Sequence, residues 1–242
     1  MNEELGTGRT LVIIPTYNES ANIKDVIARL QITQPKVDIL IVDDNSPDGT
    51  GKIADSLVNT KIFVLHRDQK AGLGPAYLAG FTWGISQNYD FFVEMDADGS
   101  HQPEELVDLL SVAQQCDLVL GTRWMPGGAV VNWPIGRRLI SKFGTKYAST
   151  VLGLPYRDLT SGYRVLSRPL VKDILDSDLQ TLGYGFQIEI VRLAAADKLK
   201  IVEVPITFVE RVAGSSKMSG KIVLEAFWMT TWWGFQRMFN RR

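Results

Sequence analysis

The sequence predicts an α/β fold in which helices cover a parallel, doubly wound sheet. Five short apolar runs alternate with segments of helical periodicity in the first half of the chain, a pattern typical of such sheets. The length of 242 residues, with 45% hydrophobic side chains, suits one α/β domain with an ample core. No internal repeat or low-complexity linker interrupts the pattern.

The first predicted strand covers 10–15 and is expected to stop at Pro15, which has no N–H to donate to a ladder. Asn18 or Ser20 is expected to cap the helix that follows, because short polar side chains accept hydrogen bonds from its first free N–H groups. The apolar side of this helix consists of Ile23, Val26, Ile27 and Leu30.

The second predicted strand, 39–42, runs into the polar loop 43–49. A strand followed by a polar, glycine-containing loop and a helix is the usual nucleotide-binding arrangement of α/β folds. The loop lacks the Gly-Lys-Ser/Thr ending of a Walker loop, so it does not predict a phosphate cradle of that type. A third strand is predicted at 61–65 and a helix at 76–87.

The fourth predicted strand begins at Phe91 and carries Asp96 and Asp98 at its end. In a continuing strand, residues i and i+2 share a face, so both carboxylates could reach one hard divalent cation. The position is also favourable, because ligands of open α/β sheets bind beyond the carboxyl ends of the strands. The alternative is a simple turn at the strand end, since Asp and Gly favour turns and Gly99 follows.

Later elements are predicted from shorter signals. Pro103 begins a helix, and a fifth strand is expected at 118–120. A basic helix is predicted at 137–152, and a strand at 199–209 that Pro205 interrupts and therefore places at a sheet edge. A further helix begins at 184–189. Its Gln187 and Glu189 either point into the site or serve ordinary capping and solvation.

The charges are balanced overall but unevenly distributed. A net charge of −1 argues against nucleic-acid binding. No acidic residue lies between Leu118 and Tyr156, and Glu225 is the only acidic residue from Arg211 to the end. We therefore expect unpaired positive charge in the second half and an anionic ligand between it and the carboxylates of the first half. The basic residues concerned are Arg123, Arg137, Arg138, Lys142, Lys146, Arg211, Lys217, Lys221, Arg237, Arg241 and Arg242.

Cysteine content and hydropathy restrict the environment of the protein. Cys116 is the only cysteine, which excludes an internal disulfide and fits a reducing compartment. It lies in an apolar run and is expected to be a packing residue. The first nine residues do not form a secretion signal, and no run of eighteen apolar residues predicts a transmembrane helix.

Two segments near the C-terminus allow alternative interpretations. The segment 211–217 is rich in small residues with a charge at each end, so it is either a mobile loop that closes over an anion or a plain surface loop. The segment 222–239 contains three of the six tryptophans. It is predicted to be a helix that either lies on a membrane surface or packs on the domain or on a partner helix.

Taken together, the motifs resemble the family-two glycosyltransferases of the GT-A type and, more closely, the dolichyl- or polyprenyl-phosphate mannosyltransferases. The resemblance extends from Leu11 to about Lys221, and the ordered set of motifs is much more specific than any single one. The motifs are IPTYNE at 14–19, VDDNSPDGT at 42–50, GLGPAY at 72–77, MDADGSH at 95–101, GTRW at 121–124, DLTSGYR at 158–164, GYGFQ at 183–187, and the segments 204–211 and 216–217.

The resemblance implies a GT-A fold: a mostly parallel, Rossmann-like sheet flanked by helices, followed by an amphipathic C-terminal helical segment. It implies a catalytic domain over 1–210, and a mobile acceptor loop with a membrane-associated segment over 211–242. The protein is then expected to lie peripherally at the cytoplasmic face of a membrane, without a transmembrane helix.

The resemblance also implies roles for individual residues. The nucleoside would be held by Pro15, Tyr17, Glu19, Val42 and Asp44, with Asp44 at the guanine or ribose edge. Asp96 and Asp98 would bind Mg²⁺ or Mn²⁺ at the diphosphate, with Met95 and Ala97 beside the donor. Some relatives have a glutamine ligand where this chain has Ser100. The catalytic set would be Asp98 together with Arg123, Arg137, Arg211 and Lys217, which grip the donor and acceptor phosphates.

The implied reaction is inverting transfer of mannose from GDP-mannose to a polyprenyl monophosphate. A divalent metal and arginines suit it, because a departing nucleoside diphosphate develops negative charge. The nearest alternative is transfer of glucose from UDP-glucose to the same kind of acceptor. A processive polysaccharide synthase would need a Gln-x-x-Arg-Trp signature, which 187–190 does not supply. A non-catalytic nucleotide-sugar sensor would not require all these charged residues together.

Overall fold

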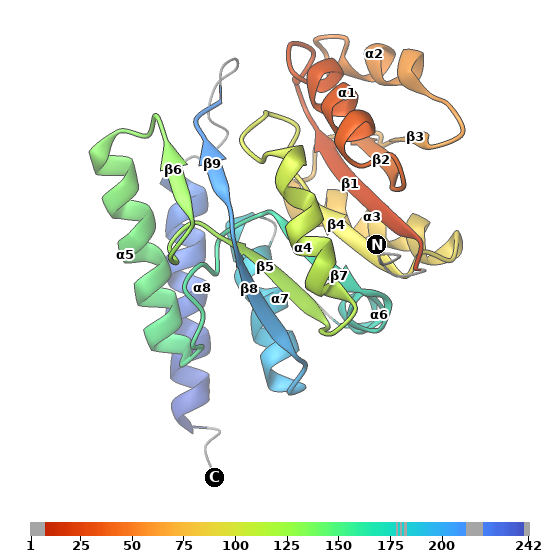
Figure 1. Ribbon diagram of the computed structural model, residues 1–242. Coiled ribbons are helices and arrows are strands. Elements are labelled where there is room, and N and C mark those ends of the chain that lie inside the picture. The colour runs from red at the N-terminus through yellow and green to blue at the C-terminus, as the bar shows by residue number, and fades with distance from the viewer. Residues whose placement is uncertain (1–7, 178, 180, 182, 212–219, 240–242) are drawn as a thin grey trace.

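A seven-stranded sheet forms the centre of the molecule (Figure 1), in the strand order β3-β2-β1-β4-β7-β5-β8. The computed structural model describes residues 8–177, 179, 181, 183–211 and 220–239. All described pairs in this sheet are parallel except those made by β7, which runs antiparallel to both β4 and β5. The strands are β1 (Thr10–Thr16), β2 (Asp38–Asp43), β3 (Ile62–His66), β4 (Phe91–Glu94), β5 (Leu118–Thr122), β7 (Arg164–Ser167) and β8 (Ile201–Pro205).

Helices cover both faces of the sheet because its central strands are apolar on both faces. In β1, Val12 and Ile14 pack toward one layer of helices, whereas Leu11 and Ile13 pack toward the other. The first layer is α1 (Ile23–Thr33), α2 (Thr50–Leu57) and α4 (Leu106–Ala113), the last preceded by the short 3-10 helix Pro103–Glu105. The second layer is α3 (Leu73–Ser86), α6 (Arg168–Asp176) and α7 (Tyr184–Ala196).

Two long helices and a small sheet stand beside this central unit (Figure 1). Helix α5 (Ile135–Leu152) and helix α8 (Gly220–Phe239) pack against each other, and α8 also contacts α7. The small sheet pairs β6 (Ala129–Val131) with β9 (Thr207–Val209). Among the described residues, no helix combines the length and the apolar character needed to cross a bilayer.

The first strand was predicted to stop at Pro15, but β1 continues through it to Thr16. The carbonyl of Ile13 accepts the N–H of Met95, so the odd residues of β1 direct their backbone groups toward β4. Strand β4 ends at Glu94, opposite Ile13. Pro15 therefore needs no N–H on that side, and the ladder to β2 continues past it.

The cap predicted for α1 was wrong. The N-cap residue is Asn22, and the Glu19 carbonyl accepts the N–H groups of Asn22 and Ile23. The backbone N–H of Asn18 instead donates to Ser46 Oγ (3.1 Å), and that of Ser20 donates to Asp48 Oδ2 (3.1 Å). These residues thus fasten the first connection to loop 43–49, a long-range role that local propensity does not reveal.

Helix α8, which contains three of the six tryptophans, packs on the domain along one side. Trp233 is only 4% exposed and belongs to the main core, and Thr230 is also buried. Tyr147 of α5 stacks on Phe227 with ring centroids 4.7 Å apart, and its hydroxyl lies 2.6 Å from Thr231 Oγ1. Packing on the domain is therefore confirmed for one side of α8, while the other side is exposed and its contact with a membrane stays a prediction.

Candidate active site

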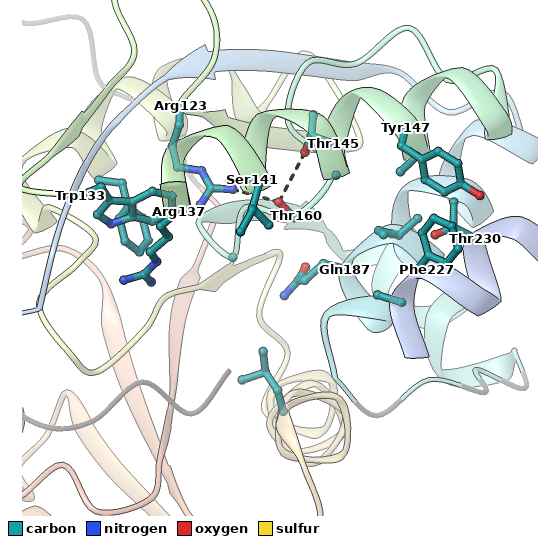
Figure 2. A pocket seen from close by; sticks show the side chains of 18 of the residues that line it. Arg123, Trp133, Arg137, Ser141, Thr145, Tyr147, Thr160, Gln187, Phe227 and Thr230 are labelled. Carbon is teal, nitrogen blue, oxygen red and sulfur yellow. Dashed lines mark hydrogen bonds between the residues drawn. The ribbon is translucent and has the colours of Figure 1, made fainter. Parts of the chain in front are cut away.

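A cavity of about 600 Å³ lies beside the carboxyl edge of the sheet, between the sheet, α5, α7 and α8 (Figure 2). One end is charged and contains Arg123, Arg137 and Asp96. The other end is apolar and is bordered by Tyr147 and Phe227, which Figure 2 shows on the far side from the arginines. The cavity therefore has separate surroundings for an anionic group and for a hydrocarbon chain.

The two aspartates of the predicted metal site lie beyond β4, not within it. Because the strand ends at Glu94 and Gly99 has a positive φ of 75°, Asp96 and Asp98 belong to a turn. The shared-face geometry of a continuing strand was therefore wrong, and the turn that was weighed against it is present. The two carboxyl groups still influence each other, because the charge of Asp98 raises the pKa of Asp96.

The electrostatics of this turn favour a cation. Burial, then the charge of Asp98, raises the pKa of Asp96 to about 8. Burial alone would raise the pKa of Asp98 as well, but the Ser100 hydrogen bond and the Arg211 guanidinium bring it below its usual range. Arg211 Nη2 lies 2.9 Å from Asp98 Oδ2, and the Ser100 hydroxyl donates to Asp98 Oδ1.

The donor set fits a hard divalent ion such as Mg²⁺ or Mn²⁺, since it offers two carboxylates that repel each other. Within the described part of the chain, no group of three or more His, Cys, Asp and Glu side chains is arranged to hold a metal ion. The remaining ligands would then come from a bound diphosphate and water. Ser100 stands where the resemblance expects a glutamine ligand in some relatives. Here its hydroxyl donates to Asp98 and orients that carboxylate.

His101 supports the turn that contains Asp96 and Asp98, here called the aspartate turn. Its Nδ1 accepts the backbone N–H of Asp96 at 3.1 Å, and its ring lies against Tyr163 and Phe208. Burial lowers the pKa of His101 to about 4, so the ring is neutral at physiological pH. With Nδ1 accepting, the proton of the neutral ring is on Nε2.

Two of the basic residues for which unpaired positive charge was predicted, Arg123 and Arg137, are paired with carboxylates. The Arg123 guanidinium donates two hydrogen bonds to Asp158, from Nε at 2.7 Å and from Nη2 at 2.8 Å, and the Arg123 backbone N–H donates a third at 3.1 Å. Arg137 Nη1 donates to both oxygens of Glu210, at 2.5 and 2.6 Å. Asp158 lies just beyond the acid-free stretch and Glu210 much further along the chain, so a count of charges along the sequence did not reveal these partners.

Aromatic rings surround the same two guanidinium groups. The Arg137 guanidinium carbon lies 4.3 Å from the Trp133 ring centroid, and that of Arg123 lies 5.5 Å from it. Arg123 is 7% exposed and also donates to Thr160 Oγ1 at 2.9 Å (Figure 2). These contacts fix the direction of both side chains toward the cavity. The charge pattern and the resemblance drew attention to Arg123 and Arg137, but did not identify Trp133 or Thr160 as their neighbours.

The residues expected to hold the nucleoside cluster at the carboxyl ends of β1 and β2. Asp44 accepts from Arg67 Nη1 at 2.8 Å, and burial raises its pKa. Lys70 Nζ lies 4.2 Å from the centroid of the Tyr17 ring. Glu19 is buried and accepts from Asn22 Nδ2 at 2.9 Å. Pro15 lies at the same edge, in register with Val42.

Three of the expected donor contacts have side chains inside the core. Val42 and Met95 are 0% exposed and Ala97 is 3% exposed. Any contact of these residues with a nucleotide would therefore go through their backbone. Lys217, the remaining member of the expected catalytic set, lies outside the described residues, as do Arg241 and Arg242.

Gln187 and Glu189 of α7, which were predicted either to point into the site or to serve capping and solvation, point in different directions. Glu189 accepts from the N–H and hydroxyl of Thr181, at 3.2 and 2.7 Å, and so fixes the beginning of α7. Gln187 borders the cavity. Helical periodicity alone did not distinguish them, because the side on which the cavity lies is set by the packing of α7 on the sheet.

The apolar end of the cavity opens onto a surface rich in exposed apolar side chains, here called the α5–α8 apolar surface. Ile140 and Phe227 border the cavity and are nevertheless 63% and 52% exposed. Basic side chains of α5, Arg138, Lys142 and Lys146, are exposed on the same helix. The surface consists of Ile135, Leu139, Ile140, Phe143, Leu224, Phe227, Trp228, Trp232, Phe235 and Phe239.

Comparison with known proteins gives consistent results. The sequence model of the family described as Glycosyl transferase family 2 matches residues 11–175. Undecaprenyl-phosphate mannosyltransferase of Micrococcus luteus is 50% identical over 228 residues, which cover 93% of this chain and 94% of that protein. Polyprenol monophosphomannose synthase of Mycolicibacterium smegmatis is 48% identical over 239 residues, covering 97% and 90%.

More distant proteins share the architecture. Dolichol-phosphate mannosyltransferase of Pyrococcus furiosus is 35% identical over 222 residues, covering 88% of this chain and 60% of that protein. The crystal structure of glucosyl-3-phosphoglycerate synthase from Mycobacterium tuberculosis with Mn²⁺, UDP-glucose and phosphoglyceric acid superposes with a TM-score of 0.70. It covers 94% of this chain and 80% of that one at 20% identity, a likeness that shows the fold alone. The predicted GT-A fold is confirmed.

Proposed function

Because this chain belongs to glycosyl transferase family 2, and within it to the polyprenyl-phosphate mannosyltransferases, we propose that it transfers mannose from GDP-mannose to a polyprenyl monophosphate with inversion. The product is a β-linked polyprenyl phosphate mannose. One observation supports this reaction above the others: a single cavity joins the aspartate turn and the arginines to an apolar end that opens between α5 and α8. An acceptor with a phosphate head and a hydrocarbon tail matches both ends.

The donor would lie along the carboxyl edge of the sheet. Its nucleoside would occupy the β1–β2 end near Tyr17 and Asp44, and its diphosphate would reach the aspartate turn at the neighbouring end of β4. Asp96 and Asp98 would hold Mg²⁺ or Mn²⁺, which supplies neutralisation of the departing diphosphate when bound. Arg211, already at Asp98, is placed to meet the same phosphates.

The acceptor phosphate would bind at the charged end between Arg123 and Arg137. Both guanidinium groups are fixed by carboxylates and aromatic rings, so little reorganisation is needed when an anion arrives. A phosphate monoester has lost its protons above its second pKa of about 6. Its oxygen can therefore attack the anomeric carbon directly, without a general base.

The position of His101 is consistent with a reaction that uses no base. Its side chain is 0% exposed, and Nδ1 is occupied by the Asp96 N–H. A base must reach the proton it removes within hydrogen-bond distance. The geometry instead supports a role for His101 in holding the aspartate turn.

The α5–α8 apolar surface would contact the membrane from its cytoplasmic side. Exposed aromatic side chains beside basic ones are typical of helices that lie at a lipid surface. Because Ile140 and Phe227 belong both to this surface and to the cavity, a lipid tail could enter without crossing water. The loop 211–217, which was predicted to close over an anion, lies outside the described residues apart from Arg211.

The test is transfer of radiolabel to a short polyprenyl phosphate, resolved by thin-layer chromatography. GDP-mannose with Mg²⁺ should give a lipid-linked product, and UDP-glucose should not. Product from UDP-glucose instead would show that the donor is wrong while the acceptor class is right. Binding of either nucleotide sugar without any transfer to the lipid would reject an enzymatic function in favour of a sensor.

A further inference from the structure

Strand β9 and the two residues that follow it connect the aspartate turn to helix α5. On one side, the N–H of Val209 donates to the carbonyl of Ser100, at the end of the aspartate turn, at 3.0 Å. On the other side, the N–H of Glu210 donates to the carbonyl of Val131 in β6, also at 3.0 Å. Strand β6 leads into α5, which carries Arg137. One short segment is therefore hydrogen-bonded to both halves of the charged end of the cavity.

Packing holds this segment in place. Phe208 is 9% exposed, and its ring centroid lies 5.4 Å from that of His101 and 5.2 Å from that of Trp133. The N–H of Thr207 donates to both carboxylate oxygens of Glu105, at 3.0 and 2.8 Å. Because the segment is fixed on both sides, it can set the distance between the aspartate turn and the beginning of α5.

The two residues after β9 make ion pairs with opposite halves of the site. Arg211 Nη2 lies 2.9 Å from Asp98 Oδ2 in the aspartate turn. Glu210 accepts from Arg137 Nη1 with both carboxylate oxygens, at 2.5 and 2.6 Å. The expected donor side and the expected acceptor side are thus joined through two consecutive residues of the chain.

Glu210 leaves the phosphate-binding edge of Arg137 available. Its carboxylate uses Nη1 of Arg137, whereas Nε is buried and has no hydrogen-bond partner among the described residues. A guanidinium binds an oxyanion strongly through two parallel N–H groups, such as those on Nε and Nη2. In Arg123 this edge is occupied by Asp158. Glu210 therefore orients Arg137 without taking the place of an anion bound at that edge.

The reaction depends on such an orientation. The attacking phosphate oxygen has to approach the anomeric carbon on the face opposite the departing diphosphate, so the two anions must be held at a defined separation. Misplacement of a reacting group by about 1 Å can cost about a hundredfold in rate. A carboxylate that fixes Arg137 relative to the aspartate turn supplies this separation.

We propose that Glu210 is a positioning residue for the transfer: it aligns Arg137, and with it the acceptor phosphate, on the sugar of the bound donor. This inference rests on the proposed function, since it takes Arg137 to bind the acceptor phosphate. Glu210 contacts neither substrate, and its loss leaves the positive charge of Arg137 in place. The effect should therefore be on kcat and not on the affinity for the acceptor.

The test measures kcat and the acceptor KM with GDP-mannose and a short polyprenyl phosphate, together with calorimetric binding of GDP in Mn²⁺. Glu210→Ala should lower kcat by about tenfold to a hundredfold. The acceptor KM should not rise, because a carboxylate that neutralises Arg137 has been removed, and the affinity for GDP should match that of the wild type.

Two further variants separate alignment from general support of the fold. Glu210→Gln keeps the shape and one oxygen that can accept from Arg137, so it should recover most of kcat. Glu104→Ala removes a carboxylate that lies 2.7 Å from Arg29 outside the site, and as the matched control it should keep both kcat and KM. If Glu210→Ala does not fold, Glu210→Met has a similar length without an acceptor oxygen and takes its place.

The remaining outcomes contradict the inference. An unchanged kcat would overturn it, and a raised acceptor KM would show that Glu210 acts on binding. A loss of GDP affinity that accompanies the loss of kcat would mean that the segment only supports the donor side. All three leave mannose transfer by the wild type intact. Wild-type enzyme that transfers no mannose to polyprenyl phosphate would overturn the proposed function and this inference together.

Discussion

The two ends of the cavity are built in opposite ways. At the charged end, Arg123 is 7% and Asp158 is 0% exposed, and hydrogen bonds fix their geometry. At the apolar end, the surface bears side chains such as Phe143 and Trp228, which are 71% and 70% exposed. The first end can recognise a phosphate by position and direction. The second end offers apolar surface but no directional hydrogen bonds. Such a surface can accept hydrocarbon chains of different lengths.

The largest expected effect comes from breaking the buried ion pair that supports the charged end. Asp158→Asn leaves Arg123 buried without its counter-charge, so the free energy of unfolding at pH 7 should fall by about 3–5 kcal/mol in urea titrations. Glu104→Gln removes the partly exposed pair with Arg29 and should cost about 0–1 kcal/mol. Equal losses in the two variants would mean that burial does not distinguish the pairs.

The same pair predicts a pH dependence. Burial would raise the pKa of Asp158, but the charge of Arg123 and the hydrogen bonds from Arg123 and Thr160 together hold the pKa below the ordinary 3.8. The stability it contributes is therefore present above pH 3.8 and is lost as the pH falls through the lower folded-state value. The difference between wild type and Asp158→Asn should shrink in the same acid range.

The next largest effect is expected at Asp98 in the aspartate turn. Asp98→Asn should lower transfer by about a hundredfold to a thousandfold, the range measured when one preorganised group at a developing charge is removed. Binding of GDP should weaken in Mg²⁺ but change little in EDTA, as calorimetry would show. A folded variant with near-normal turnover would show that Asp98 has no role in holding the metal.

Changes at the apolar end should be smaller and confined to lipid. Trp233 is in the core, so of the three C-terminal tryptophans only Trp228 and Trp232 are available to a membrane. Trp228→Ser with Trp232→Ser should reduce sedimentation with anionic vesicles about tenfold or more, since each large apolar side chain contributes ~1.5–3 kcal/mol when fully buried.

Affinity for GDP-mannose and activity on short acceptors should stay unchanged in that double variant. Ile32 of α1 is 79% exposed outside this surface, and Ile32→Ser is the matched control. Vesicle binding that is equally reduced by Ile32→Ser would remove the distinction between the α5–α8 apolar surface and other exposed apolar residues.

The smallest effect is expected at His101. His101→Gln should loosen the aspartate turn and weaken Mn²⁺ binding several-fold, while the shape of the pH–rate profile stays the same. The rate should rise near pH 6 as the acceptor ionises and remain flat to about pH 8. Because the pKa of His101 is near 4, that rise does not report on His101. A profile that flattens in the variant would instead indicate a base.

Local signals in the sequence were sufficient for much of the fold. The apolar runs located β1 to β5, and the 3.6-residue period identified the buried face of α1 through Ile23, Val26, Ile27 and Leu30. Pro205 correctly placed β8 at the edge of the sheet, because proline interrupts a ladder. These features depend on the residue itself or on neighbours within a few positions.

What the sequence did not reveal depends on distant partners. The antiparallel strand β7 was not predicted, because its direction is set by pairing with β4 and β5. Arg137 is neutralised by Glu210 and Arg123 by Asp158, choices that only the folded chain determines.

The insertion of β7 also has a consequence for the order in which the chain folds. Strands β1 to β4 pair with one another using residues 10–94 alone, whereas β5 joins the sheet only through β7, which begins at residue 164. During synthesis, β5 must therefore wait for at least forty more residues before it finds its neighbour. Contacts between distant parts of a chain form slowly. In pulse-labelled hydrogen exchange during refolding, we expect the amides of β1 and β2 to become protected before those of β5.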